Sequence, residues 1–104
     1  MQRTANFKML SSLHPGEVLR EEFLKPLALS AGKVAKATGV PRTRIERLVN
    51  EHVDLTPDTA LRLAKYFGTS PEFWMNLESR YALEHAADAL GHELDRIQPI
   101  APRA

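Results

Sequence analysis

Prolines, glycines and small polar residues divide the chain into five segments of helix length. The segments open on residues suited to a helix start, and the first, second and fourth close at a proline or glycine, which suit a helix end. No segment alternates apolar and polar residues with the period of two that a strand requires. The sequence therefore predicts an all-α fold, with helices over about 17–25, 30–39, 41–50, 56–68 and from 70 onward.

Individual residues set these boundaries. Ser30, Thr56 and Ser70 are predicted N-caps, because a side-chain hydroxyl can accept a hydrogen bond from a free N–H of the first helical turn. Pro26 is predicted to end the first helix, and Pro41 is predicted to occupy the first position of the third.

Composition excludes several classes of protein. The 104 residues are 43% hydrophobic and 26% charged, which is typical of one soluble globular domain. The absence of cysteine excludes disulfides, thiolate zinc sites and a cysteine nucleophile. No run approaches the roughly 18 apolar residues of a membrane span, and the stretch from Met1 to Leu13 is too weakly apolar for a signal peptide. We expect a cytoplasmic protein with no membrane partner.

The formal net charge of +1 conceals an uneven distribution. Residues 30–50 carry five basic side chains and one acidic one, whereas residues 51–104 carry five basic and nine acidic ones. A short basic block in a small, otherwise neutral or acidic protein favours a surface that meets phosphate. A solvated basic face without a partner is the alternative.

The basic block coincides with two helices joined by a very short turn, which is the helix-turn-helix arrangement. Ala35, Gly39, Ile45 and Leu48 follow the spacing Ala-x3-Gly-x5-Ile-x2-Leu. A small residue at 35 allows the helices to cross closely, glycine at 39 permits the turn, and the two aliphatic residues anchor the second helix of the pair on the core. An ordinary helical hairpin with a charged solvent face is the alternative.

The remaining side chains of these two helices are predicted to contact DNA. On the second helix, arginine can pair bidentately with guanine in the major groove, and asparagine can read adenine. Residues of the preceding helix would meet phosphates. The predicted DNA-binding residues are Ser30, Lys33, Lys36, Arg42, Thr43, Arg44, Arg47 and Asn50.

Four runs of sequence resemble the HigA-type antitoxins, the VapI-like branch of the Xre helix-turn-helix regulators. The resemblance covers about residues 14–83 and implies a five-helix, lambda-repressor-like, homodimeric domain. It also implies two partners: double-stranded operator DNA ahead of the protein's own operon, which it represses, and a HigB-type toxin, a RelE-like ribonuclease, which it neutralises. The alternative is a stand-alone DNA-binding regulator without a toxin. The runs are HPGEVLREEF (14–23), LVN (48–50), TPDTALRLA (56–64) and FGTSPEFWMNL (67–77).

Two positions depart from the family pattern. Ala31 stands where the family often has a glutamine that touches the DNA backbone, and residues 51–54, EHVD, replace a Gly-Lys-Arg-like loop. Both changes remove phosphate contacts, so we predict weaker DNA binding that relies on few arginines and is sensitive to salt.

The chain is predicted to comprise a flexible arm (1–12), the helix-turn-helix domain (13–83, with the motif at about 30–50), a C-terminal helical extension (84–98) and a flexible tail (99–104). Apolar residues in and before the extension are spaced four and three apart, which forms an a/d seam. The seam has two interpretations: a contact with a second copy or with the toxin, or packing on the chain's own core. Its residues are Leu83, Ala87, Leu90, Leu94 and Ile97.

No catalytic motif or phosphate-binding loop occurs, so we expect neither enzymatic activity nor a cofactor. Four polar residues of the extension, His85, Asp88, His92 and Asp95, share one helix face. Histidine and carboxylate can bind zinc, but a single exposed helix offers no supporting ligand shell. We therefore interpret them as a solvated polar face and expect no metal. His14 and the aromatic pair Phe73–Trp74 are interpreted as structural.

Overall fold

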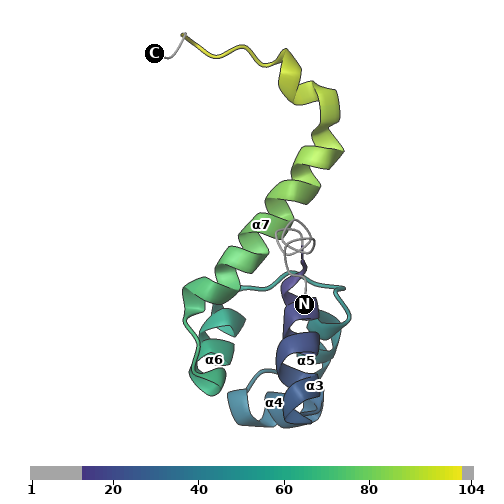
Figure 1. Cartoon of the computed structure of the whole chain (residues 1–104), viewed down its shortest axis with the longest axis vertical. Helices are drawn as coiled ribbons and strands as arrows, with labels where there is room; N and C mark the ends of the chain where they lie inside the picture. Colours follow the sequence, from purple (N-terminus) through teal and green to yellow (C-terminus); the bar gives the residue numbers. More distant parts are fainter. Residues whose placement is uncertain (1–12, 102–104) are drawn as a thin grey trace, which may run out of the picture.

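The computed structural model describes residues 13–101, all of whose regular elements are helical (Figure 1). The predicted arm 1–12 and residues 102–104 of the predicted tail lie outside the described residues. Three short elements follow one another as a single rod, and five further helices and turns complete the described fold. The elements are α2 (Pro15–Val18), η1 (Leu19–Leu24), α3 (Lys25–Leu27), α4 (Ala31–Thr38), α5 (Arg42–Val49), α6 (Pro57–Phe67), α7 (Pro71–Leu90) and η2 (Gly91–Arg96).

The first rod contains a π-helical turn, η1, and does not end at Pro26 as predicted. The N–H of Lys25 donates to the carbonyl of Arg20, five residues earlier. In an α-helix a proline ring clashes with the carbonyl four residues before it, and the wider π turn gives that ring more room. The rod therefore continues to Leu27 and ends where Ala28 adopts a left-handed φ of 53°.

The predicted N-caps are confirmed. The hydroxyl of Ser30 accepts the N–H of Lys33 at 3.1 Å. Thr56 and Ser70 cap α6 and α7 through the same bond, at 3.3 and 3.0 Å. Pro41, in contrast, lies one residue earlier than predicted, at the N-cap of α5.

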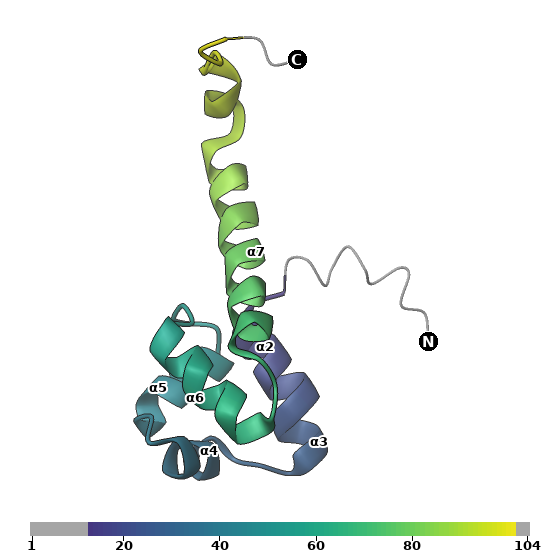
Figure 2. The ribbon, with the colours of Figure 1, turned by 90° about the vertical axis from the view of Figure 1, so that its left-hand side faces the viewer.

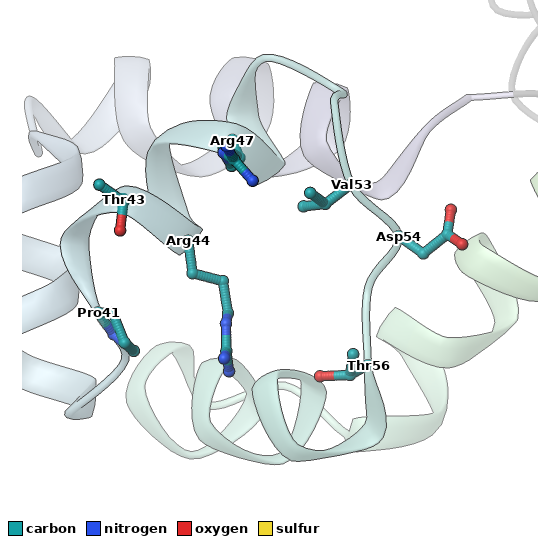
Figure 3. A pocket seen from close by; sticks show the side chains of 7 residues that line it. All are labelled: Pro41, Thr43, Arg44, Arg47, Val53, Asp54 and Thr56. Atoms are coloured by element: carbon teal, nitrogen blue, oxygen red, sulfur yellow. The ribbon is translucent and has the colours of Figure 1, made fainter.

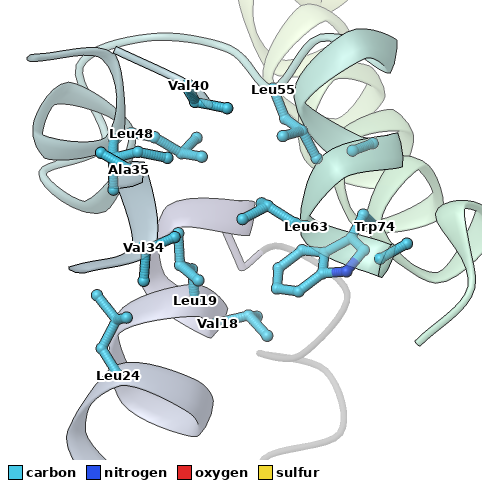
Figure 4. Packing of buried hydrophobic residues seen from close by; sticks show 13 residues of the cluster. Val18, Leu19, Leu24, Val34, Ala35, Val40, Leu48, Leu55, Leu63 and Trp74 are labelled. Atoms are coloured by element: carbon cyan, nitrogen blue, oxygen red, sulfur yellow. The ribbon is translucent and has the colours of Figure 1, made fainter. Parts of the chain in front are cut away.

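The core lies where these helices meet (Figure 4). The Trp74 indole is fully buried, and its Nε1–H donates to the hydroxyl of Thr69 at 2.8 Å. A buried indole N–H normally needs such a partner. The structural interpretation is thereby confirmed for Trp74, but it does not hold for Phe73, which is 38% exposed and not part of the buried core. The largest fully buried apolar side chains are Trp74, Leu19, Ile45, Leu48, Leu63 and Val34.

α2 and α5 touch backbone to backbone. A Cβ atom placed on Gly16 would lie 1.7 Å from the carbonyl oxygen of Leu48, which no side chain can tolerate. Beside this contact the buried His14 caps α2, since its Nδ1 accepts the N–H of Gly16 at 2.8 Å. Its ring also packs edge-on against Tyr81, with centroids 4.8 Å apart. His14 is therefore structural, as predicted.

α7 has two distinct halves. Its first half packs on α6 and α2, whereas every described residue from Ala82 onward is exposed. Figures 1 and 2 show the second half projecting away from the other helices.

The apolar seam predicted along the C-terminal extension is interrupted. α7 ends at Leu90, Gly91 has a φ of 54°, and the 3-10 turn η2 follows. Leu83 and Ala87 therefore lie on α7, and Leu94 lies beyond the break. Because Leu83, Leu90 and Leu94 are 67%, 41% and 45% exposed, the stripe does not pack on the core of its own chain.

Candidate nucleic-acid interface

α4 and α5 form the helix-turn-helix that the spacing predicted. Ala35, Ile45 and Leu48 are buried between these helices and the core. Gly39 closes α4 with a φ of 78°, a conformation that glycine adopts without the penalty of a Cβ atom. The four spaced residues therefore perform the packing and turning roles expected of them.

Arg62 of α6 holds this turn in place, and sequence reasoning missed it. Its Nη1 donates to the carbonyl of Thr38, the last residue of α4, at 2.8 Å. Its Nε pairs with Asp58 at 2.8 Å, which orients the guanidinium. A basic side chain on the final carbonyls stabilises a helix C-terminus. Only the i, i+4 spacing of Asp58 and Arg62 was visible beforehand, and it does not reveal the contact with α4.

All eight predicted DNA-binding residues are exposed. Ser30, Lys33 and Lys36 lie along α4 and the other five along α5 and at its ends. The hydroxyl of Ser30 already accepts a hydrogen bond from the N–H of Lys33, as the cap of α4.

The three arginines of α5 are not equivalent. Arg42 is 71% exposed, but its Nε pairs with Glu46, one turn along the same helix, at 2.8 Å. Within residues 13–101, Arg44 and Arg47 form no ion pair or side-chain hydrogen bond. Two full positive charges therefore remain available on the outer face of α5.

Arg44 and Arg47 border a hollow of about 620 Å³ between α5 and the segment leading into α6 (Figure 3). Arg44 extends from α5 toward α6, while the carboxylate of Asp54 points away from it on the far side of the loop. The carboxylate of Asp54 therefore does not neutralise Arg44.

The negative charge of the loop over residues 51–54 is also partly neutralised, by an arginine of the first rod. Glu51 has a left-handed φ of 62°, and its carboxylate pairs with Arg20 Nη2 at 3.2 Å. Arg20 also donates to the carbonyl of Val49, at the end of α5. The same guanidinium hydrogen-bonds Glu21 and lowers the pKa of that carboxyl. Arg20 thus ties the first rod to the end of α5, and Glu51, one of the two acidic residues of the loop, has a partner.

Comparison with known proteins decides the family. A family model described as Helix-turn-helix matches residues 21–74. Virulence-associated protein I of Dichelobacter nodosus is 48% identical over 77 residues, which cover 74% of this chain and 71% of that protein. Antitoxin HigA-1 of Vibrio cholerae is 34% identical over 85 residues, covering 82% and 80%. The chain belongs to the HigA family of helix-turn-helix proteins.

Solved antitoxin structures share this architecture. Pseudomonas aeruginosa antitoxin HigA with the higBA promoter superposes with a TM-score of 0.83 at 40% identity, covering 86% of this chain and 99% of that one. The antitoxin GraA in complex with its operator superposes with a TM-score of 0.81 at 37% identity, covering 86% of this chain and 92% of that one. The expected five-helix HigA fold, with its helix-turn-helix, is confirmed.

The polar residues of the extension stay apart from this interface. His85 and Asp88 lie on α7, whereas His92 and Asp95 lie on η2, where they approach each other to 3.4 Å. Over residues 13–101 no three acidic or histidine side chains are grouped as a metal ion would require. Nor does any helix in that range have the length and apolarity to cross a membrane.

Proposed function

We propose that this chain represses its own operon and neutralises a RelE-like ribonuclease toxin. The observation that carries the DNA half is the pair of exposed, unneutralised arginines, Arg44 and Arg47, on α5 of a HigA-type helix-turn-helix. Relatives solved with a promoter or an operator support this assignment. In this proposal α5 enters the major groove, and Lys33 and Lys36 meet the flanking phosphates.

The toxin half is supported by the family alone. A relative at 34% identity bears the name antitoxin HigA-1. The protein would act in the cytoplasm, by binding alone, without catalysis or a cofactor. A stand-alone regulator is the second candidate. Co-expression with the product of a neighbouring RelE-like reading frame, followed by pull-down, separates the two, because a stand-alone regulator would retain no such partner.

We also propose a homodimer, formed through the projecting half of α7. Its exposed apolar residues Leu83, Ala87 and Leu90 have no partner within the described chain, and Leu94 follows on η2. Two copies joined there would present two α5 helices to a palindromic operator, with half-sites about 34–36 Å apart.

Arg44→Ala tests base reading directly. We expect it to weaken binding to the DNA ahead of its own operon by about 5- to 150-fold, the equivalent of one lost bidentate base contact. Binding to random DNA should fall far less. Arg96→Ala, which removes an exposed arginine of η2, is the matched control. Fluorescence anisotropy at fixed salt measures the affinity for each DNA. An equal loss of affinity for the two DNAs would mean that Arg44 contacts only phosphate.

A further inference from the structure

A second concave surface is lined by no residue of α5. The first rod and the beginning of α7 enclose a groove of about 580 Å³. Apart from Leu13, the lining residues come from α2, η1 and α7 and none comes from α4 or α5, so the groove is separate from the helix-turn-helix surface. Apolar side chains (Phe23, Phe73 and Leu77) and acidic ones (Glu17, Glu21 and Glu22) line the groove; below, the apolar set is called its floor and the acidic set its rim.

The floor is preorganised. Phe73 is 38% exposed, yet its ring packs edge-on against the buried Trp74, with centroids 5.1 Å apart. It also stands 6.3 Å from the ring of Phe23. Its backbone N–H is fixed by the Ser70 cap at 3.0 Å. A large aromatic side chain that is held rigidly while exposed is typical of a protein-binding surface.

The rim determines the charge of the occupant. Glu21 is shared between Arg20 and Lys25, at 2.9 and 3.0 Å. Glu17 and Glu22 form no ion pair with any residue of the described range. Arg80 is the basic residue that lines the groove, so the acidic groups outnumber it. Phosphate would be repelled here, and a cationic surface with apolar side chains would be attracted.

We infer that this groove is the docking surface for the toxin, and specifically for basic and apolar side chains on it. The inference rests on the proposed neutralisation, because a protein that cleaves RNA must present basic groups to a phosphate backbone. Since the groove shares no residue with the outer face of α5, toxin and operator can be held at the same time. The groove thus binds protein, and α5 binds nucleic acid.

The test reverses the charge of the rim in the full-length chain. The probe is the recombinant product of the RelE-like reading frame beside this one, and binding is measured by biolayer interferometry. We expect Glu17→Lys with Glu22→Lys to weaken toxin binding by about tenfold or more and to leave operator binding within about twofold. The double variant Glu84→Lys with Glu93→Lys makes the same change in net charge at exposed positions outside the groove and should bind toxin normally. Phe73→Ala, checked for folding by circular dichroism, should also weaken toxin binding.

Four results would overturn the inference. If the Glu17/Glu22 variant binds the toxin with unchanged affinity, the groove is not the docking site. The proposed neutralisation would still stand in that case, because the unaltered chain binds the toxin. Equal losses in the Glu17/Glu22 and Glu84/Glu93 variants indicate a net-charge effect without a docking site. A drop in mass of the Glu17/Glu22 variant by light scattering makes the groove a contact between two copies. Failure of the unaltered chain to bind the probe contradicts the proposed neutralisation itself, and the groove assignment with it.

Discussion

The carboxylate of Glu78 on α7 accepts a hydrogen bond from the backbone N–H of Leu55 at 2.9 Å, across 23 positions of sequence. Glu78 is only 9% exposed, so this carboxylate is a buried polar group with a specific task. It fastens the segment that precedes α6, and the neighbouring residues of that segment border the hollow beside Arg44 and Arg47. α7 thereby supports one edge of the hollow beside Arg44 and Arg47 without lining it.

Glu78→Ala should therefore lower the free energy of unfolding by about 1–3 kcal/mol, because it leaves the N–H of Leu55 buried without an acceptor. Glu78→Gln retains an acceptor oxygen at the same reach and should lose much less. Urea unfolding followed by circular dichroism measures both. Equal losses in the two variants would mean that charge, rather than this hydrogen bond, is what the site requires.

Gly16→Ala should destabilise the fold by about 3 kcal/mol or more, since the added methyl would overlap the carbonyl of Leu48. Gly32→Ala is the matched control. At Gly32 a Cβ would have its nearest neighbours at 3.8 Å, and alanine favours the helix by up to about 1 kcal/mol. The two variants should shift the thermal midpoint in opposite directions, and a Gly16→Ala protein as stable as the unaltered chain would contradict the close approach.

Arg20→Ala should weaken operator binding by about threefold, because it leaves the Glu51 carboxylate unpaired at the end of α5. Adding Glu51→Ala should restore most of the lost affinity. Anisotropy titrations of the single and double variants complete the cycle. If the double variant binds no better than Arg20→Ala, the contribution of Arg20 comes from its bond to the Val49 carbonyl instead.

Lowering the pH should remove the contribution that the Glu21 carboxylate makes to the free energy of unfolding. The hydrogen bond from Arg20, followed by that from Lys25, lowers the pKa of Glu21 below its ordinary 4.5. A carboxyl with a lowered pKa stabilises the folded state above its unfolded pKa, and that stabilisation is lost as the pH falls through the folded value. The difference in unfolding free energy between the unaltered chain and Glu21→Gln should thus be present at pH 7 and shrink below about pH 4.5. A difference that does not change with pH would contradict the pairing.

Truncation after Tyr81 should leave the domain folded, because every described residue beyond that point is exposed. If the projecting half of α7 joins two copies, the truncated protein should be a monomer by light scattering while its unfolding transition is retained. A truncated protein of dimeric mass would place the dimer contact elsewhere.

The local features of this fold could be predicted from sequence because their causes are local. Ser30, Thr56 and Ser70 act through N–H groups three residues away, and Gly39 needs only its own φ. The misplacement of Pro41 by one residue is within the usual uncertainty of helix boundaries. The continuation of the rod past Pro26 depends on a π turn for which the sequence carries no clear signal.

The long-range contacts that hold α4 and α5 in place could not be predicted from the sequence. Arg20 meets Glu51 across 31 positions, and Arg62 meets Thr38 across 24. Such contacts depend on how the helices pack, which spacing along one helix does not specify. The exposure of the predicted contact residues of α5 did follow from spacing, because Ile45 and Leu48 fix the inner face of α5 and so its outer face as well.

The approach of Gly16 to Leu48 leaves no side chain between the first rod and α5. The distance between these two elements is therefore not adjustable by exchanging one residue for a larger or smaller one. What remains open to change is the solvent side of α5, where Arg44, Arg47 and Asn50 can be replaced without repacking the interior. A chain built this way can acquire a new operator while its scaffold stays the same.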